Sequence, residues 1–423
     1  MNATWFKEPK YAWVGLGSLW IIGFIGALTR FSMAYFQVKI SEDLEISRGF
    51  ISMTWSTNML ITALCAPLGG WLVDRYGAKK VLLISAVMGT LGTGIVVIGE
   101  HSIVFFIGYA VISGLAGIGA TTTYLLMFEW FSHHRAKAMA LLTSANSIGL
   151  AITTPIFVSQ SWLTWKDAFL TSFVLSILIS LPFIMLGVKG SQQSKATTSK
   201  VDGSIEAENH DHDKPHTDTV APSLKRVGYL PIFILVAIAL FTCGINMGTV
   251  EMNLVAIHQM ANVSPSMIAL SMSILGILEI IGSFAFGFLL DRFNKLVMMA
   301  MLFGIRIMGF AFLFMHVGWS PILFAIAFGM TYLSAIPGGI LIVNEYAKGK
   351  GKQMGFLLFF HKGGAILGAL IGGLSFDYFK NYQVLIGFDV VICILVTVGF
   401  VSLYISRRRS HRLHNVHNMK ASA

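Results

Sequence analysis

A few ionisable side chains of this sequence stand within long apolar stretches, where they could bind a ligand or carry a proton. They are Arg30, Glu251, Glu279, Arg306, His361, Lys362 and Asp389. A charge placed deep in hydrocarbon costs at least about 2.5–3.5 kcal/mol. Each of these residues is therefore expected to have a partner, a ligand or a role in proton movement.

Three of them are basic side chains of the kind that handles anions and protons. The guanidinium of Arg30 can grip a carboxylate with two parallel hydrogen bonds, and the ammonium of Lys362 is a compact point charge. His361 can exchange protons near neutral pH. Because neighbours on a helix point about 100° apart, only one of His361 and Lys362 is expected to face a central cavity.

The apolar stretches that hold these residues are expected to be membrane-spanning helices. Of 423 residues, 55% are hydrophobic and 12% are charged, about half the charged fraction of a soluble domain. Blocks of about 20 apolar residues can cross a bilayer as helices. They lie near 11–37, 50–73, 81–99, 103–128, 137–158, 168–187, 229–254, 266–290, 295–315, 320–344, 354–376 and 383–405. The predicted fold class is an all-α membrane protein with twelve transmembrane helices.

Within such spans each charge also has a structural interpretation. Arg30 and Lys362 could extend to the membrane surface, and His361 could be a packing residue. Arg306 is expected to form a structural ion pair with Glu279. The alternative is that Glu279, like His361, carries a coupling proton.

The remaining acids, Glu251 and Asp389, are interpreted as structural or interfacial, with Glu251 near the outer end of the seventh span.

The distribution of basic residues predicts the orientation. With an inside N-terminus, 23 of the 30 Lys and Arg residues fall on inside segments and four on outside loops. Both termini are therefore expected in the cytoplasm, in a cell membrane. The net charge of +10 follows from this topology, so no nucleic-acid partner is expected.

The chain divides into two repeated halves. The polar stretch 188–227 is predicted to be a cytoplasmic linker between six-helix bundles at 1–187 and 228–405, with a tail at 406–423. The histidines at 210, 212 and 216 in the linker, and at 411, 414 and 417 in the tail, are expected to be solvated sequence, and no metal site is predicted.

Each half carries the same short motif after its second span. Asp74 and Arg75 follow the second span, and Asp291 and Arg292 follow the eighth. These charges can bond to neighbouring helix ends and are expected to form a conformational latch on the cytoplasmic side of each half. Internal repeats of six spans are typical of one large transporter architecture.

These motifs resemble those of the major facilitator superfamily, and several segments resemble its bacterial branch related to monocarboxylate transporters and oxalate–formate exchangers. The segments are 30–36, 44–48, 130–138, 165–169, 253–256 and 361–377. The resemblance implies alternating access and a small organic anion, moved with a proton or in exchange for a counter-anion. Members of that branch carry an arginine in the eighth span, whereas the equivalent stretch 282–287 has none.

The predicted function is secondary active transport of small, monocarboxylate-like anions by a monomer in a lipid bilayer, without a cofactor. Tyr124 and Asn246 join Arg30, His361 and Lys362 as candidate substrate contacts, because their spans line the cavity in this architecture. The alternatives are an exporter of drug-like or other small organic compounds and a non-transporting solute sensor. The sequence has no Walker-type loop or nucleophile elbow, so neither a nucleotide-driven pump nor an enzyme is expected.

Overall fold

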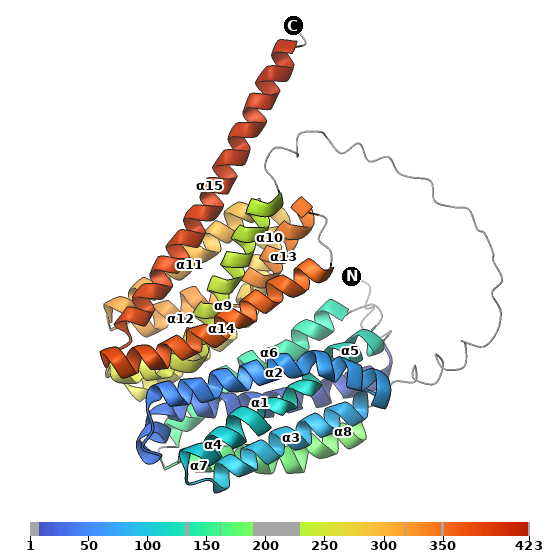
Figure 1. The fold of residues 1–423 in the computed structure, drawn as a ribbon, viewed down its shortest axis with the longest axis vertical. Helices are drawn as coiled ribbons and strands as arrows, with labels where there is room; N and C mark the ends of the chain where they lie inside the picture. Colours follow the sequence, from blue (N-terminus) through green and yellow to red (C-terminus); the bar gives the residue numbers. More distant parts are fainter. Residues whose placement is uncertain are drawn as a thin grey trace, which may run out of the picture.

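The structure is a computed structural model that describes residues 8–131, 135–160, 162–188, 229–316, 318–347 and 351–421. Over these residues it is all-helical (Figure 1). The helices are α1 Lys10–Asp43, α2 Arg48–Tyr76, α3 Ala78–Ile98, α4 Ser102–Phe106, α5 Ala120–Trp130, α6 Arg135–Ser159, α7 Trp165–Leu175, α8 Leu181–Gly187, α9 Tyr229–Met260, α10 Pro265–Arg292, α11 Lys295–Met315, α12 Ser320–Thr331, α13 Ala335–Ala347, α14 Gly351–Phe379 and α15 Gln383–Ala421.

Twelve segments of the described chain are long and apolar enough to cross a membrane, which confirms the predicted fold class. Their ends agree with the predicted ends to within six residues, and the first and seventh spans run six residues further than expected. The predicted cytoplasmic tail instead continues the last span as one helix, because α15 extends to Ala421.

Three spans are interrupted rather than continuous. In the fourth span, π-helical and 3₁₀ turns over Ile107–Ile112 and Gly114–Gly119 separate α4 from α5. The sixth span consists of α7 and α8 around a π-helical turn, Ser176–Ser180. The tenth consists of α12 and α13. Backbone N–H and C=O groups at such breaks have no water to bond to in a membrane, so polar side chains are expected beside them.

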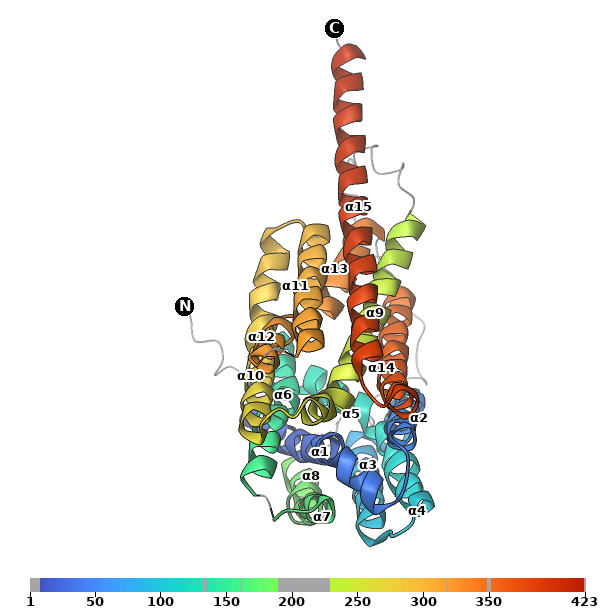
Figure 2. The same cartoon turned by 90° about the vertical axis from the view of Figure 1, so that its left-hand side faces the viewer.

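The helices gather into two groups that follow the order of the chain (Figure 1). Helices α1–α8 form the N-terminal group and α9–α15 form the C-terminal group. The groups pack against each other along α2 and α14, α6 and α10, and α1 and α9. Figure 2 shows α15 projecting well beyond the helices it packs against.

The two groups are held together on the side away from the chain termini. Because α2 begins and α14 ends on that side, the carboxylate of Asp377 meets the first turn of α2. It accepts hydrogen bonds from the backbone N–H groups of Arg48 (3.1 Å) and Gly49 (2.8 Å). Gln37 of α1 donates to the carbonyl of Met252 in α9 (2.5 Å). Among the described residues, hydrogen bonds between the groups lie at mid-length or on this far side.

Glycine permits the closest of these approaches. A Cβ atom on Gly373 of α14 would lie 2.6 Å from the carbonyl oxygen of Arg48. A Cβ atom on Gly276 of α10 would lie 2.4 Å from that of Ser147 in α6. Small residues at such crossings let membrane helices pack backbone to backbone. The same approach brings polar side chains of opposite groups within bonding distance.

Candidate functional site

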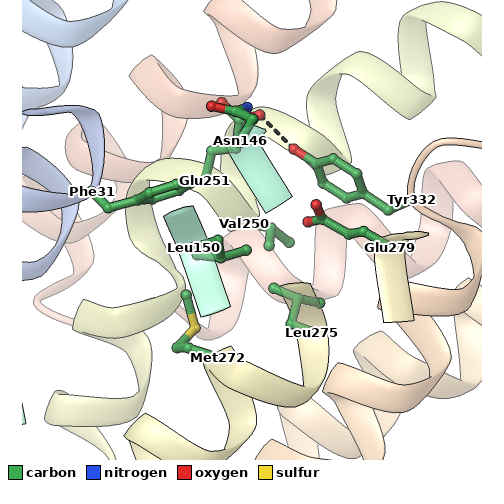
Figure 3. Close-up of a pocket in the computed structure, with 9 residues that line it drawn as sticks. All are labelled: Phe31, Asn146, Leu150, Val250, Glu251, Met272, Leu275, Glu279 and Tyr332. Atoms are coloured by element: carbon green, nitrogen blue, oxygen red, sulfur yellow. Dashed lines mark hydrogen bonds between the residues drawn. The ribbon is translucent and has the colours of Figure 1, made fainter. Parts of the chain in front are cut away.

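A small pocket lies between the two groups at mid-length of the spans (Figure 3). Apolar side chains make up most of its wall, and its polar lining comes from Asn146, Glu251, Glu279 and Tyr332. The complete lining is Phe31, Asn146, Leu150, Val250, Glu251, Met272, Leu275, Glu279 and Tyr332, contributed by the first, fifth, seventh, eighth and tenth spans. A pocket shared by helices of both groups is suited to a ligand that must be reached from either side of a membrane.

Glu251 of α9 is the centre of the charged cluster beside this pocket. One guanidinium nitrogen of Arg30 in α1 lies 3.9 Å from its carboxylate, so the ion pair joins the two groups. The hydroxyl of Tyr332 donates a hydrogen bond to the same carboxylate (Figure 3). The side chain of Arg30 remains 42% exposed and that of Glu251 is 14% exposed. The contact of Arg30 is therefore at the limit of an ion pair, and most of its donors remain available.

The structure separates the neighbours His361 and Lys362 of α14. His361 is buried, with Nε2 3.2 Å from the sulfur of Met247 in α9. Lys362 is exposed, and its ammonium interacts electrostatically with Glu251 and Arg30. Lys362 is thus the member of the pair that belongs to the central cluster, whereas His361 packs between helices of one group.

Glu279 of α10 has a different environment from the one expected. It is 4% exposed, and its carboxylate accepts a hydrogen bond from the hydroxyl of Ser147 in α6 (2.6 Å). The expected ion pair with Arg306 is not formed, because each residue is engaged elsewhere. Glu279 instead links the N-terminal to the C-terminal group through a neutral hydroxyl.

Arg306 of α11 is fully buried within the C-terminal group and is surrounded by acceptors. It donates to Asn246 Oδ1 (3.3 Å), to the hydroxyl of Thr331 (3.3 Å) and to the carbonyls of Thr331 (2.9 Å) and Tyr332 (3.3 Å). Its guanidinium also lies 4.9 Å from the centre of the Phe328 ring. Arg306 therefore acts as a structural cation.

The carbonyls that Arg306 binds are available because the tenth span is broken. Pro337 in the first turn of α13 has no N–H to bond to the carbonyl of Leu333, which disfavours a continuous helix through this part of the span. The chain between Thr331 and Ala335 is a turn rather than a helix, and the guanidinium supplies donors to the carbonyls at the break. The same break sets the position of Tyr332 in the pocket wall.

Asn246 of α9 lies in the same buried network and is not part of the pocket wall, and its role as a substrate contact stays a prediction. Its amide nitrogen donates to Asp389 of α15 (2.7 Å), while its oxygen accepts from Arg306 and from the thiol of Cys393 (3.2 Å). Both Asn246 and Asp389 are fully buried. The side chain joins three helices of one group, and both its amide nitrogen and its oxygen have partners within that group.

Tyr124 of α5 is 45% exposed and is not part of the pocket wall. Its role as a substrate contact stays a prediction.

The motif residues Asp74, Arg75, Asp291 and Arg292 are all exposed at ends of α2 and α10 on the side of the termini. The two arginines lie over aromatic rings of their own helices. The latch role of these four residues stays a prediction.

The histidine-rich linker lies outside the described residues, as do the side chains of the histidines in the tail. Within the described chain, no group of three or more His, Cys, Asp or Glu side chains is placed to hold a metal ion.

Sequence reasoning missed Glu251 and Tyr332 as members of the site. Glu251 was recognisable as a charge within a span, but its depth was underestimated because α9 continues to Met260. Nothing in the sequence immediately around Tyr332 indicates that it belongs to the site. The proline five residues later, in a span otherwise suited to a continuous helix, is the feature that could have indicated it.

Comparison with known proteins identifies the family. A model of the Major Facilitator Superfamily matches residues 19–347 and 236–421. The chain is 25% identical over 426 residues to the uncharacterized MFS-type transporter YcxA of Bacillus subtilis, covering 96% of this chain and 99% of that protein.

Two further relatives are similar over shorter regions. The D-galactonate transporter of Escherichia coli is 28% identical over 41% of each chain. Monocarboxylate transporter 12 of Mus musculus is 23% identical over 55% of this chain and 51% of its own length. Among solved structures, that of the nucleoside transporter NupG superposes with a TM-score of 0.70 at 14% identity, over 92% of this chain and 100% of that one. The chain is a multi-pass membrane protein that belongs to the Major Facilitator Superfamily.

Proposed function

We propose that this protein is a secondary active transporter of small organic anions, monocarboxylate-like in size and charge, with its substrate site at Arg30 and Lys362. The observation that carries the proposal is that most N–H donors of the Arg30 guanidinium have no partner among the described residues. Its side chain is 42% exposed beside the central pocket and has one carboxylate at 3.9 Å. A partly exposed guanidinium with free N–H donors beside a pocket can bind a second carboxylate through two parallel hydrogen bonds.

Lys362 supplies the second positive charge of the proposed site. It is exposed and interacts electrostatically with Arg30 and with Glu251, so two cations of opposite groups, which repel each other, share a single carboxylate. A substrate carboxylate would relieve that repulsion and would draw α1 and α14 together. Tyr332 and Asn146 in the pocket wall could bond to hydroxyl or keto oxygens of such a substrate.

The relatives support the class of substrate. Their names refer to galactonate and to monocarboxylates, and all of these carry a carboxylate group. We extend that class to this chain on the basis of the two central cations, and leave the particular acid to experiment.

The proposed transport mechanism is alternating access between a six-helix bundle at 1–187 and another at 228–405, acting as a monomer. Contacts between the groups lie at mid-length and on the side away from the termini, which supports a conformation that is open toward the termini. With both termini inside, as the distribution of basic residues favours, this is an inward-facing state. The exposed motifs at Asp74 and Asp291 would then latch in the opposite, outward-facing state.

Export of cationic compounds is the second candidate function. The observation that favours it is that Glu251 and Glu279 both line the pocket, because an exporter of cations needs an acid in its central cavity. Glu251 is accompanied by two cations, however, and Glu279 is occupied by Ser147, so neither offers a free acid to a cationic ligand.

The test is counterflow uptake into proteoliposomes of radiolabelled L-lactate, pyruvate, formate, oxalate and D-galactonate, with and without a proton gradient. The wild type is compared with Arg30→Ala and with Lys39→Ala, a surface cation of the same helix that pairs with Glu42. We expect uptake of at least one acid by the wild type and by Lys39→Ala, and its loss in folded Arg30→Ala. If folded wild type takes up none of the acids, the anion proposal is wrong, and export of organic cations is tested next.

A further inference from the structure

We propose that Glu251 is the coupling residue of this transporter, because its carboxylate contacts the same Arg30 guanidinium that is proposed to bind the substrate carboxylate. Protonation of Glu251 would release Arg30 and Lys362 to the substrate. The inference rests on the proposed function and assigns to that site both its coupling ion and its proton acceptor.

The first argument is the chemistry of the groups that surround Glu251. The guanidinium of Arg30 in α1 and the phenol hydroxyl of Tyr332 at the break in the tenth span contact it, and the ammonium of Lys362 in α14 interacts with it electrostatically. All three are donors that bind carboxylates, and they come from both helix groups. A site built to hold an external carboxylate would contain the same set of donors, so Glu251 is an internal occupant of that site.

The second argument is that the internal carboxylate is held weakly enough to be replaced. The separation from Arg30 is 3.9 Å, beyond the 2.7–2.9 Å of a charge-assisted hydrogen bond. Arg30 approaches one oxygen of the carboxylate, and the hydroxyl of Tyr332 donates to the other oxygen. Arg30 can therefore turn to a substrate without breaking a close ion pair.

Proton uptake makes the replacement favourable. The –COO⁻ group of Glu251 takes one proton to become –COOH, which removes its attraction for the two cations. The cations then balance the charge of the substrate instead. One monoanion moving with one proton carries no net charge, so the proposal predicts electroneutral symport rather than exchange of anions.

Other titratable groups near the cluster are less suited to this role. Tyr109 of the fourth span interacts electrostatically with Arg30 and Glu251, but it is buried and is not part of the pocket wall. Glu279 bonds only to Ser147 among the described residues and has no cation that a substrate could compete for. His361 lies against Met247 and interacts electrostatically with Lys362 and Arg306, but it is not part of the pocket wall. Among these groups, only Glu251 both lines the pocket and interacts with Arg30 and Lys362.

The experiment measures proton-driven accumulation in proteoliposomes of the acid in the panel above that the wild type takes up. It compares Glu251→Gln, Glu279→Gln and the surface control Glu42→Gln. Glutamine mimics the protonated acid in shape and charge. We expect Glu251→Gln to lose accumulation driven by the gradient while still exchanging labelled for unlabelled acid at an altered rate. Glu42→Gln should accumulate the acid as the wild type does.

A second measurement does not require the variant to complete the transport cycle. Purified protein in weakly buffered detergent is mixed with the same acid, and proton uptake is followed with a pH dye. We expect uptake by the wild type and its loss in Glu251→Gln that still binds the acid. Retained accumulation or retained proton uptake in Glu251→Gln would overturn the proposal, as would a loss confined to Glu279→Gln. Absence of uptake of every acid by folded wild type would instead overturn the proposed function.

Discussion

The two arginines within the spans, Arg30 and Arg306, have opposite environments. Arg306 is fully buried in one helix group and donates to Asn246, Thr331 and the carbonyl of Tyr332. Arg30 lies between two groups, is 42% exposed and has one carboxylate at 3.9 Å. The same side chain is therefore saturated in one place and only partly bound in the other.

The difference indicates which charge stabilises the fold and which is available to a ligand. A buried cation whose three nitrogens all have hydrogen-bond partners gains little from a new anion, and removing it takes a charged donor away from buried acceptors. A cation with free donors beside a pocket loses little structure when it is replaced but loses its ability to bind. The number of satisfied donors thus distinguishes the two roles better than depth in the membrane does.

The largest effect is expected from replacing Arg306. Arg306→Met keeps an unbranched side chain but takes a charged donor away from Asn246 Oδ1 and from the carbonyls of Thr331 and Tyr332. Among the described residues, Asn246 Oδ1 would keep only the weak thiol donor of Cys393, and the Thr331 carbonyl only the long bond from the N–H of Ser334 (3.4 Å). Breaking a buried charged network costs about 3–5 kcal/mol. We expect a marked fall in the melting temperature of the purified protein. Arg30→Met is the matched control, and an equal fall in both variants would contradict the comparison.

Replacing Arg30 is expected to act on transport rather than on stability. A hydrogen bond to a charged group contributes about 1.5–3 kcal/mol, so Arg30→Met should weaken anion binding about 10- to 100-fold. Arg30→Lys keeps the charge but loses the fork geometry and should fall between the two. Uptake kinetics and melting temperatures measured on the same preparations separate the effects. Normal anion affinity in Arg30→Met would show that the exposed donors of Arg30 have no ligand.

A substitution of Asn246 tests whether the network around Arg306 contributes to stability alone or also to substrate binding. Asn246→Leu removes the acceptor of Arg306 and the donor to Asp389, and each buried group left unsatisfied costs about 1–3 kcal/mol. We expect reduced stability with an unchanged preference among the acids that are transported. Asp389→Asn, which retains an oxygen acceptor, should be milder. A changed order of preferred acids in Asn246→Leu would place Asn246 in the binding site.

The spans and the presence of partners for buried charges could be predicted from the sequence, but the choice of partner could not. Hydropathy fixes where a helix must cross, so all twelve spans were found. Which faces meet depends on packing that no local pattern records. Arg306 was assigned to Glu279 because both lie at similar depth, yet the break before Pro337 offered carbonyls closer at hand.

Glu251 shows how an error of a few residues in a span changes an interpretation. Ending the seventh span near residue 254 placed this acid at the membrane surface, whereas α9 continues to Met260. The six additional residues correspond to about 9 Å of helix, which places the carboxylate deeper in the span, at the level of the pocket. A side chain that was interpreted as interfacial is consequently the proposed coupling residue.

The smallest effect is expected from Asp377. Its carboxylate has hydrogen-bond partners, as Arg306 has, but these partners belong to the opposite helix group. Its carboxylate accepts from the N–H groups of Arg48 and Gly49 at the start of α2. In addition, the Arg48 guanidinium lies 4.6 Å from the centre of the Phe376 ring. Unlike the network of Arg306, these contacts must break in every cycle if the groups separate on this side. Asp377 should therefore shift the equilibrium between the open and closed conformations of this side and contribute little to the stability of the fold.

Asp377→Asn keeps one of the two oxygen acceptors and loses the other. It also loses the negative charge at the positive end of a helix, a contribution of about 0.3–1 kcal/mol. The closed population on this side should fall about 2- to 5-fold relative to the open one. Spin labels at Glu45 and Asn381, exposed in the connections before α2 and after α14, would report the change as a longer distance component. Glu42→Gln, which alters a surface acid near the same end of α1, should leave the distances as they are. An unchanged distribution in Asp377→Asn would mean that the close packing of Gly373 on α2, rather than the charge, holds this side shut.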